Sequence, residues 1–235
     1  MLDKLEKNSL NQGEIEPITI LLADDHPLVR QALKNLLSSQ PDMKVIGEAA
    51  NGEEAVRLAG ELQPAVIIMD IGMPVMNGLE ATRQIKVNNP NIAILVLTVH
   101  TDKEHVIGIL DAGAAGYLTK VVFGDDVIRA IQAIVAGEAV LTPSILQQIL
   151  KVVPKETTRP VILPPGLSFT PREQIILKLA ARGLSNKDIA SELNLSVRTV
   201  KAHLVDLFSK IGVGSRTEAV VTGLKMGFLT LNDLG

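Results

Sequence analysis

Five short apolar runs alternate in strict order with amphipathic stretches over the first part of this chain. The apolar runs lie at Ile18–Ala23, Met43–Glu48, Ala65–Met69, Ile92–Thr98 and Ala115–Thr119, and the helical patterns lie near residues 27–39, 52–62, 77–88, 102–112 and 124–137. Several runs are almost wholly aliphatic and β-branched, which is typical of parallel strands covered on both faces. The pattern predicts a doubly wound α/β domain, and we expect the flavodoxin-like strand order 2-1-3-4-5.

The rest of the chain predicts a second domain behind a linker. Residues 154–166 contain four prolines, which cannot continue a helix and favour a semi-extended linker. A short helix is expected after Pro143, through Val153. We therefore divide the 235 residues into a polar N-terminal arm at 1–17, the α/β domain at 18–137, a linker helix and proline-rich linker at 138–166, and a C-terminal domain at 167–235.

The sequence of the C-terminal domain contains N-cap and C-cap signals that indicate four short helices. Thr170-Pro-Arg-Glu173 and Ser215-Arg-Thr-Glu218 have the pattern of capping boxes, and glycines follow the apolar periodicity at the helix ends. The expected helices are bounded by Thr170 and Gly183, by Ser185, by Ser196 and Gly212, and by Ser215 and Gly227. A small all-α domain follows from this pattern.

Charge and composition narrow the choice of partners. Residues 1–153 carry a net charge of −7, whereas residues 167–235 carry +3, so a polyanion would meet the C-terminal end. The chain has no cysteine, which excludes disulfide and thiol chemistry. No apolar run approaches the roughly 20 residues needed to span a bilayer, and the N-terminus lacks the apolar stretch of a signal peptide. We expect a cytoplasmic protein without membrane association.

Three carboxylates follow neighbouring strands of the predicted sheet. Asp24 and Asp25 end the first run and Asp70 ends the third, so all three meet at the topological switch point, where open α/β sheets bind ligands. Such clustered negative charge is strained unless a carboxylate is protonated or a cation neutralises it, and oxygen ligands favour Mg²⁺. Thr98 and Lys120 follow the fourth and fifth runs. Together these groups fit a carboxylate nucleophile that accepts a phosphoryl group.

Residues 18–137 resemble a receiver domain of two-component signalling. The resemblance rests on Asp24-Asp25, Asp70-Ile-Gly-Met-Pro74 with Gly78, Thr98, and Gly116-Tyr-Leu-Thr-Lys120. It implies that Asp70 is the phosphoacceptor and that Mg²⁺ is held by Asp25, Asp70 and the Gly72 carbonyl, with Asp24 assisting through water. Thr98 and Tyr117 would be the switch pair, the ring of Tyr117 turning inward on phosphorylation, and Lys120 would bind the phosphoryl group.

Residues 167–229 resemble the LuxR-type helix-turn-helix of NarL/FixJ regulators. The resemblance is carried by Leu167-Ser-Phe-Thr-Pro-Arg-Glu173, Gly183-Leu-Ser-Asn-Lys-Asp-Ile-Ala190, Ser196-Val-Arg-Thr-Val-Lys-Ala-His203 and Lys210-Ile-Gly-Val-Gly-Ser-Arg-Thr-Glu-Ala219. It implies binding to double-stranded DNA, and a fourth helix that supplies a dimer through Val220, Val221 and Leu224.

The third helix of this domain has the pattern of a recognition helix. Val197, Val200, Leu204, Leu207 and Ile211 recur at helical spacing and should face the core. On the opposite face, Lys201 is suited to guanine, and Ala202 and Val205 to thymine methyl groups. The expected phosphate contacts are Arg198, Thr199, His203 and Lys187. Asp206 would repel DNA unless it pairs with Lys210, its i+4 neighbour.

These features predict a DNA-binding transcriptional regulator that is controlled by a sensor histidine kinase. The regulator itself is expected to catalyse at most its own dephosphorylation. In this hypothesis the unphosphorylated receiver masks the recognition helix, and the phosphorylated protein binds inverted half-sites as a homodimer. Two alternatives remain open. A phosphatase with an aspartyl intermediate would need a second acid at position 26, which is His26. A constitutive DNA binder would use its receiver only as a dimerisation scaffold.

Overall fold

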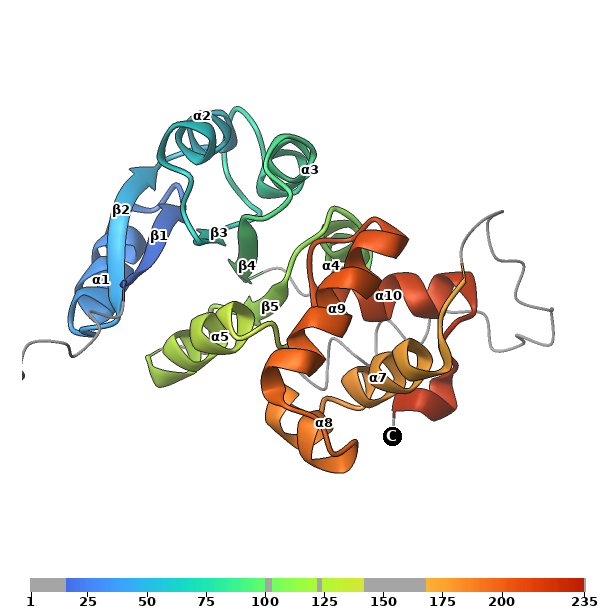
Figure 1. Ribbon diagram of the computed structural model, residues 1–235. Helices are drawn as coiled ribbons and strands as arrows, with labels where there is room; N and C mark the ends of the chain where they lie inside the picture. The colour runs from blue at the N-terminus through green and yellow to red at the C-terminus, as the bar shows by residue number, and fades with distance from the viewer. Residues whose placement is uncertain (1–15, 100–102, 122–123, 142–167, 235) are drawn as a thin grey trace, which may run out of the picture.

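The structure is a computed structural model that describes residues 16–99, 103–121, 124–141 and 168–234. The predicted linker helix after Pro143, the proline-rich segment 154–166 and the arm before residue 16 lie outside the described residues. An α/β domain and a helical domain pack side by side (Figure 1). Among the described residues, no helix is both long and apolar enough to cross a membrane.

The parallel sheet confirms the predicted topology and adds one strand. Its strands are β1 (Ile18–Ala23), β2 (Met43–Ala49), β3 (Val66–Met69), β4 (Ala93–Thr98), β5 (Gly116–Thr119) and β6 (Val140–Leu141). They lie in the order β2-β1-β3-β4-β5-β6. The sixth strand pairs with the edge strand β5 in parallel, where the sequence analysis expected the start of a linker. Two residues are too few to show periodicity, and the free edge of β5 gives them hydrogen-bond partners.

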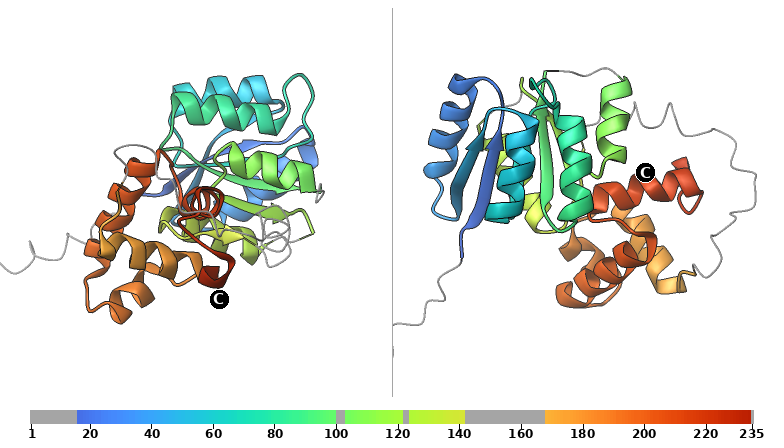
Figure 2. Two further views of the ribbon diagram at one scale, coloured as in Figure 1. Left: turned by 90° about the vertical axis from the view of Figure 1, so that its right-hand side faces the viewer. Right: turned by 90° about the horizontal axis from the view of Figure 1, so that it is seen from above.

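Two layers of helices cover the sheet, as its aliphatic strands predict (Figures 1 and 2). The helices of this domain are α1 (Pro27–Ser38), α2 (Gly52–Leu62), α3 (Gly78–Asn88), α4 (Lys103–Asp111) and α5 (Asp125–Val135). One hydrophobic cluster joins one face of the sheet to α2, α3 and α4, and a second joins the other face to α1 and α5. This arrangement leaves the carboxyl ends of the strands clear of helices.

The C-terminal domain has the four predicted helices and a final 3-10 turn. They are α7 (Pro171–Ala181), α8 (Asn186–Glu192), α9 (Val197–Ile211) and α10 (Arg216–Met226), followed by η1 (Leu231–Leu234). The capping box of Thr170 and Glu173 is present. At α10, Ser215 accepts the Glu218 N–H, but the Glu218 carboxylate accepts from the Gly214 N–H at 2.8 Å. The reciprocal half of the predicted capping box is therefore missing there.

Helix α9 presents the face that the periodicity predicts, with two differences. Val200, Leu204 and Leu207 are buried, whereas Val197 is 40% exposed because it lies in the first turn of the helix, at the domain surface. The second difference concerns Lys210, the neighbour that could have paired with Asp206. Lys210 Nζ instead donates to Glu173 Oε1 on α7 at 2.6 Å, since a buried carboxylate competes better than an exposed one at i−4.

The two domains meet through α10, the turn that precedes it and the start of α8. Helix α10 packs against α4, Thr217 Oγ1 donates to the Ala115 carbonyl at 2.5 Å, and Lys225 forms an ion pair with Asp111. Asn186 Nδ2 donates to the Ala136 carbonyl at 2.7 Å. The contact lies at the amino ends of β3, β4 and β5, the edge of the sheet opposite the aspartates.

Candidate functional site: the acidic edge and the exposed recognition helix

The predicted carboxylates lie together because β1 and β3 are neighbours in register. The Asp70 N–H donates to the Ala23 carbonyl at 2.8 Å, and the Asp24 N–H to the Ala49 carbonyl at 3.1 Å. These bonds continue the sheet for one residue and place the two side chains at the same edge. Asp24 and Asp70 are 3% and 4% exposed, so their charges are largely removed from water and need compensation.

Lys120 supplies part of that compensation. Its Nζ lies 2.6 Å from Asp24 Oδ2 and 2.9 Å from Asp70 Oδ2, and its backbone N–H is fixed by the Thr98 carbonyl at 2.9 Å. Burial lowers the pKa of Lys120, but hydrogen bonds and charge from Asp24 and Asp70 outweigh it and raise the pKa above its ordinary value. The ammonium group therefore stays charged at the acidic edge.

Asp25 leaves one acceptor atom without a hydrogen-bond donor. Its Oδ1 is buried and accepts no hydrogen bond from the described residues, although His26 Nδ1 lies at an ion-pair distance of 2.7 Å. A buried carboxylate oxygen without a donor beside two further carboxylates is the environment that a divalent cation satisfies. The residues present therefore fit the Mg²⁺ that receiver domains generally hold at this site.

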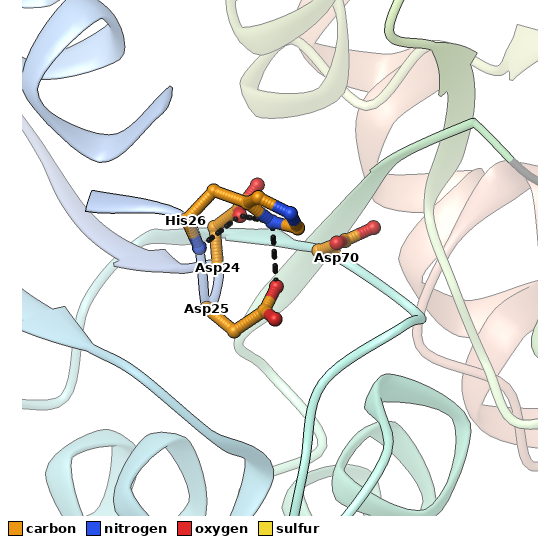
Figure 3. Close-up of side chains that lie close together, drawn as sticks. All are labelled: Asp24, Asp25, His26 and Asp70. Atoms are coloured by element: carbon orange, nitrogen blue, oxygen red, sulfur yellow. Dashed lines mark hydrogen bonds and ion pairs between the residues drawn. The ribbon is translucent and has the colours of Figure 1, made fainter. Parts of the chain in front are cut away.

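His26 belongs to the same cluster, which the sequence analysis missed. Its ring Nδ1 also lies 3.2 Å from Asp24 Oδ1, and Figure 3 shows the ring beside the two carboxylates with its edge toward Asp70. The ligand atoms of Asp24, Asp25, His26 and Asp70 all lie within 4.8 Å of one another. The available signal was a potential nitrogen ligand directly after two aspartates.

The loop after Asp70 folds tightly over its backbone. The Gly78 N–H donates to the Ile71 carbonyl at 2.9 Å, and a Cβ on Gly78 would lie 2.0 Å from the Asp70 carbonyl oxygen. Only glycine fits this approach. Within the loop, Val75 has a φ of +68°, a left-handed conformation that a β-branched residue adopts only under strain.

Val75→Asn is expected to stabilise the protein by about 1 kcal/mol, because asparagine tolerates the left-handed region far better than valine. Little packing is lost, since Val75 is 76% exposed. Urea denaturation measures the change. Val87→Asn is the matched control, because Val87 is also exposed, at 81%, but lies within α3. An equal gain in both variants would contradict strain at Val75.

The other predicted residues of the phosphorylation site lie where the strand order places them. Thr98 ends β4 and is fully buried, and Gly72 is exposed in the loop after Asp70. Tyr117 on β5 is 0% exposed, so its ring already lies inward in this conformation. Lys120 contacts Asp24 and Asp70, and His26 contacts Asp24 and Asp25. The roles of Thr98, Tyr117 and Gly72 stay predictions.

The predicted DNA-reading face is open to solvent. Lys201, Ala202 and Val205 are exposed, with Val205 at 63%. Among the predicted phosphate contacts, Arg198 and Lys187 are exposed, and Thr199 and His203 are half-buried. The expectation that the receiver masks the recognition helix is therefore wrong as regards burial of its side chains, because the receiver contacts α10 rather than this face of α9.

The predicted dimerisation stripe on α10 is buried instead. Val220, Val221 and Leu224 are 4%, 5% and 1% exposed. They belong to one hydrophobic cluster that also contains Val106, Ile109 and Leu110 of α4. The apolar core thus continues from one domain into the other through α10, which is not available to a second copy in this arrangement.

Comparison with known proteins agrees with the geometry. Residues 20–132 match the response regulator receiver domain, and residues 167–222 match the bacterial regulatory proteins of the luxR family. The chain is 38% identical to the transcriptional regulatory protein YdfI of Bacillus subtilis over 91% of this chain and 99% of that one. It is 41% identical to the nitrate/nitrite response regulator NarL of Escherichia coli over 88% and 94%.

A solved structure of a response regulator is similar to part of this chain. The crystal structure of a LuxR-family two-component response regulator from Aurantimonas sp. is 37% identical, with a TM-score of 0.54 over 58% of this chain and 97% of that one. The fold, the acidic edge and the exposed basic helix define a response regulator with a DNA-binding output domain. The chain belongs to the NarL/FixJ family of two-component response regulators, with an N-terminal receiver and a C-terminal LuxR-type helix-turn-helix.

Proposed function

We propose that a sensor histidine kinase phosphorylates this transcriptional regulator on Asp70, and that phosphorylation frees α10 for dimeric binding to inverted DNA half-sites in the cytoplasm. The observation that carries the proposal is the placement of three aspartates and Lys120 at one end of the sheet. Regulators of this class are typically not enzymes. Neither the comparisons nor the geometry favours the constitutive DNA binder or the phosphatase.

Asp70 is the nucleophile in this proposal. Its Oδ1 accepts the Ile71 N–H at 2.8 Å and its Oδ2 faces Lys120, so the carboxylate is held in one orientation. One of its oxygens forms a bond to the phosphorus of the donor phosphohistidine, while the phosphorus–nitrogen bond breaks and its electron pair stays on the leaving imidazole.

The remaining groups hold charge around the transferred phosphoryl group. Lys120 stays protonated and offsets charge on the phosphoryl oxygens, and the Thr98 hydroxyl is proposed to hydrogen-bond one of them. Asp24, Asp25, Asp70 and the Gly72 carbonyl are the proposed Mg²⁺ site. When bound, Mg²⁺ supplies further charge compensation at the same oxygens.

The regulatory part of the proposal rests on α10. Val220, Val221 and Leu224 are buried, and α10 packs against α4 of the receiver as well as against α7 and α9. In the proposal, an α10 dimer forms only after α4 has withdrawn from α10. Thr98 and Tyr117 are the proposed link from Asp70 to the neighbouring β4, β5 and α4, and α4 is the element against which α10 packs. Phosphorylation thereby shifts the chain toward the open, dimeric form.

Operator binding tests this proposal. Bound fragments are first selected from genomic DNA, and their affinity is then measured with and without beryllofluoride and Mg²⁺, for the wild-type protein and for Asp70→Asn. We expect tighter binding with beryllofluoride only in the wild type. Equal affinity of both proteins with and without beryllofluoride would contradict control of DNA binding by phosphorylation and would favour the constitutive DNA binder.

Lys201→Ala should weaken binding to the selected site by about 1–3 kcal/mol and relax the base preference at one position, because a lysine that reads guanine is lost. Arg198→Ala is the comparison. As a phosphate contact, it should weaken binding to all sequences alike and reduce the salt dependence by about one released ion. Competition assays at several salt concentrations measure both. If Lys201→Ala weakens binding to all DNA sequences equally, Lys201 contacts phosphate rather than a base.

A further inference from the structure

His26 occupies a position that its local backbone role does not explain. It is the N-cap residue of α1 and precedes Pro27, but its side chain makes no capping hydrogen bond. Serine, threonine, aspartate and asparagine are the side chains that cap helices well. The His26 N–H donates to Asp24 Oδ1 at 2.9 Å, which holds the residue against the carboxylates.

The ring of His26 is turned into the acidic cluster instead of the helix end (Figure 3). Nδ1 lies 2.7 Å from Asp25 Oδ1 and 3.2 Å from Asp24 Oδ1. The side chain is 64% exposed, so the imidazole stands at the mouth of the site and is free to approach an ion from the solvent side. Asp25 Oδ1 is buried and accepts no hydrogen bond from the part of the chain that the structure describes.

The geometry comes close to that of a mixed nitrogen and oxygen metal site. Ligand atoms at about 2.0–2.2 Å from a transition metal lie at most about 4.4 Å apart. The corresponding atoms of Asp24, Asp25, His26 and Asp70 lie within 4.8 Å of one another, which exceeds that limit by only a few tenths of an ångström.

Mg²⁺ and divalent transition-metal ions differ in how much they gain from binding the imidazole of His26. Mg²⁺ prefers oxygen ligands and retains several waters, so it gains little from an imidazole. Imidazole suits Fe²⁺, Ni²⁺, Cu²⁺ and Zn²⁺, and the affinity of a given site rises from Mn²⁺ to Cu²⁺. Mn²⁺ also favours oxygen ligands, but it accepts an imidazole nitrogen more readily than Mg²⁺ does. We propose that His26 Nδ1 is a direct ligand in this site and makes the receiver a selective binder of divalent transition metals.

The inference rests on the metal-binding part of the proposed function but not on phosphoryl transfer. A transition metal would occupy the carboxylates that Mg²⁺ uses, and His26 would set its advantage over Mg²⁺. Because His26 is one ligand among several, its loss should weaken transition-metal binding without abolishing Mg²⁺ binding.

Electron spin-echo measurements on Mn²⁺ added to the full chain test the proposal, with no phosphodonor present. The wild type should show nitrogen-14 modulation from one coordinated imidazole, and His26→Asn should lose it. The Mn²⁺ dissociation constant should rise at least about tenfold in His26→Asn, and that of Mg²⁺ less than about threefold. His203→Asn, in α9 of the other domain, should change neither.

Two results would overturn the inference. Mn²⁺ binding without nitrogen-14 modulation in the wild type would show an all-oxygen site, and equal weakening of Mn²⁺ and Mg²⁺ in His26→Asn would show that His26 only positions Asp24 and Asp25. In both cases the proposed phosphorylation stands. It is measured separately, as labelling of Asp70, and fails independently if Asp70 takes no phosphoryl group.

Discussion

Phosphoryl incorporation from acetyl phosphate is expected to fall at least about a thousandfold when Asp70 is replaced by asparagine, because an amide oxygen does not attack phosphorus and no other group takes its place. Asp24 is also buried, and in both aspartates Oδ2 lies against Lys120 and Oδ1 accepts a backbone N–H. Asp70 is the proposed phosphoacceptor because it begins the receiver motif Asp70-Ile-Gly-Met-Pro74, in which Gly72 is open to solvent. Acid-sensitive labelling followed by mass spectrometry measures the change.

Asp126→Asn is the matched control for this substitution. Asp126 is exposed on α5 and pairs with Arg129, so the same chemical change occurs outside the acidic site and labelling should remain at the wild-type level. Urea denaturation of both variants checks that the fold is retained. Retained labelling in Asp70→Asn would place the phosphoacceptor on another carboxylate of the cluster.

The position of the acidic edge followed from the sequence because parallel strands are short, buried and aligned at their carboxyl ends. Each predicted apolar run agrees with its observed strand to within about one residue at either end. Once the order 2-1-3-4-5 is fixed, Asp24 and Asp70 must be neighbours. Lys120 reaches both carboxylates because β5 ends one residue before it.

Features that depend on tertiary partners were not predictable in the same way. The i+4 spacing offered Lys210 as a possible partner for Asp206, but Lys210 binds Glu173, which lies 37 residues away in the sequence. The strand β6 has only two residues and forms because β5 offers an edge. The exposure of the recognition helix depends on which face of the helical domain meets the receiver. The hydrophobic periodicity of the helices does not indicate which face that is.

Gly214→Leu is expected to open the domain interface and raise DNA affinity without phosphorylation. Gly214 precedes α10, and a Cβ at this position would lie 2.7 Å from the Pro90 carbonyl oxygen and 2.6 Å from Lys86 Nζ. Lys86 cannot yield freely, since its Nζ already donates to the Pro90 carbonyl at 2.6 Å. Gly214 has no left-handed φ, so the substitution strains the interface rather than the helical domain.

The size of this effect follows from the coupling between the domains. If the interface favours the closed form by about 1–3 kcal/mol, its loss raises the affinity of the unphosphorylated protein for its operator about 5–150-fold. Small-angle scattering should show a larger radius of gyration, and sedimentation should show dimers without beryllofluoride. Phosphorylation of Asp70 should remain at the wild-type rate, because the interface lies at the opposite edge of the sheet.

Gly60→Leu separates interface opening from a general effect of a larger residue. A Cβ on Gly60 meets no atom within 4 Å and the residue lies within α2, so this variant should remain closed and respond normally to beryllofluoride. An open Gly214→Leu monomer with unchanged DNA affinity would show that the closed arrangement does not restrain the output domain. Phosphorylation would then have to control DNA binding through contacts between receivers. The burial of Val221 and its neighbours on α10 would stabilise the fold without regulating DNA binding.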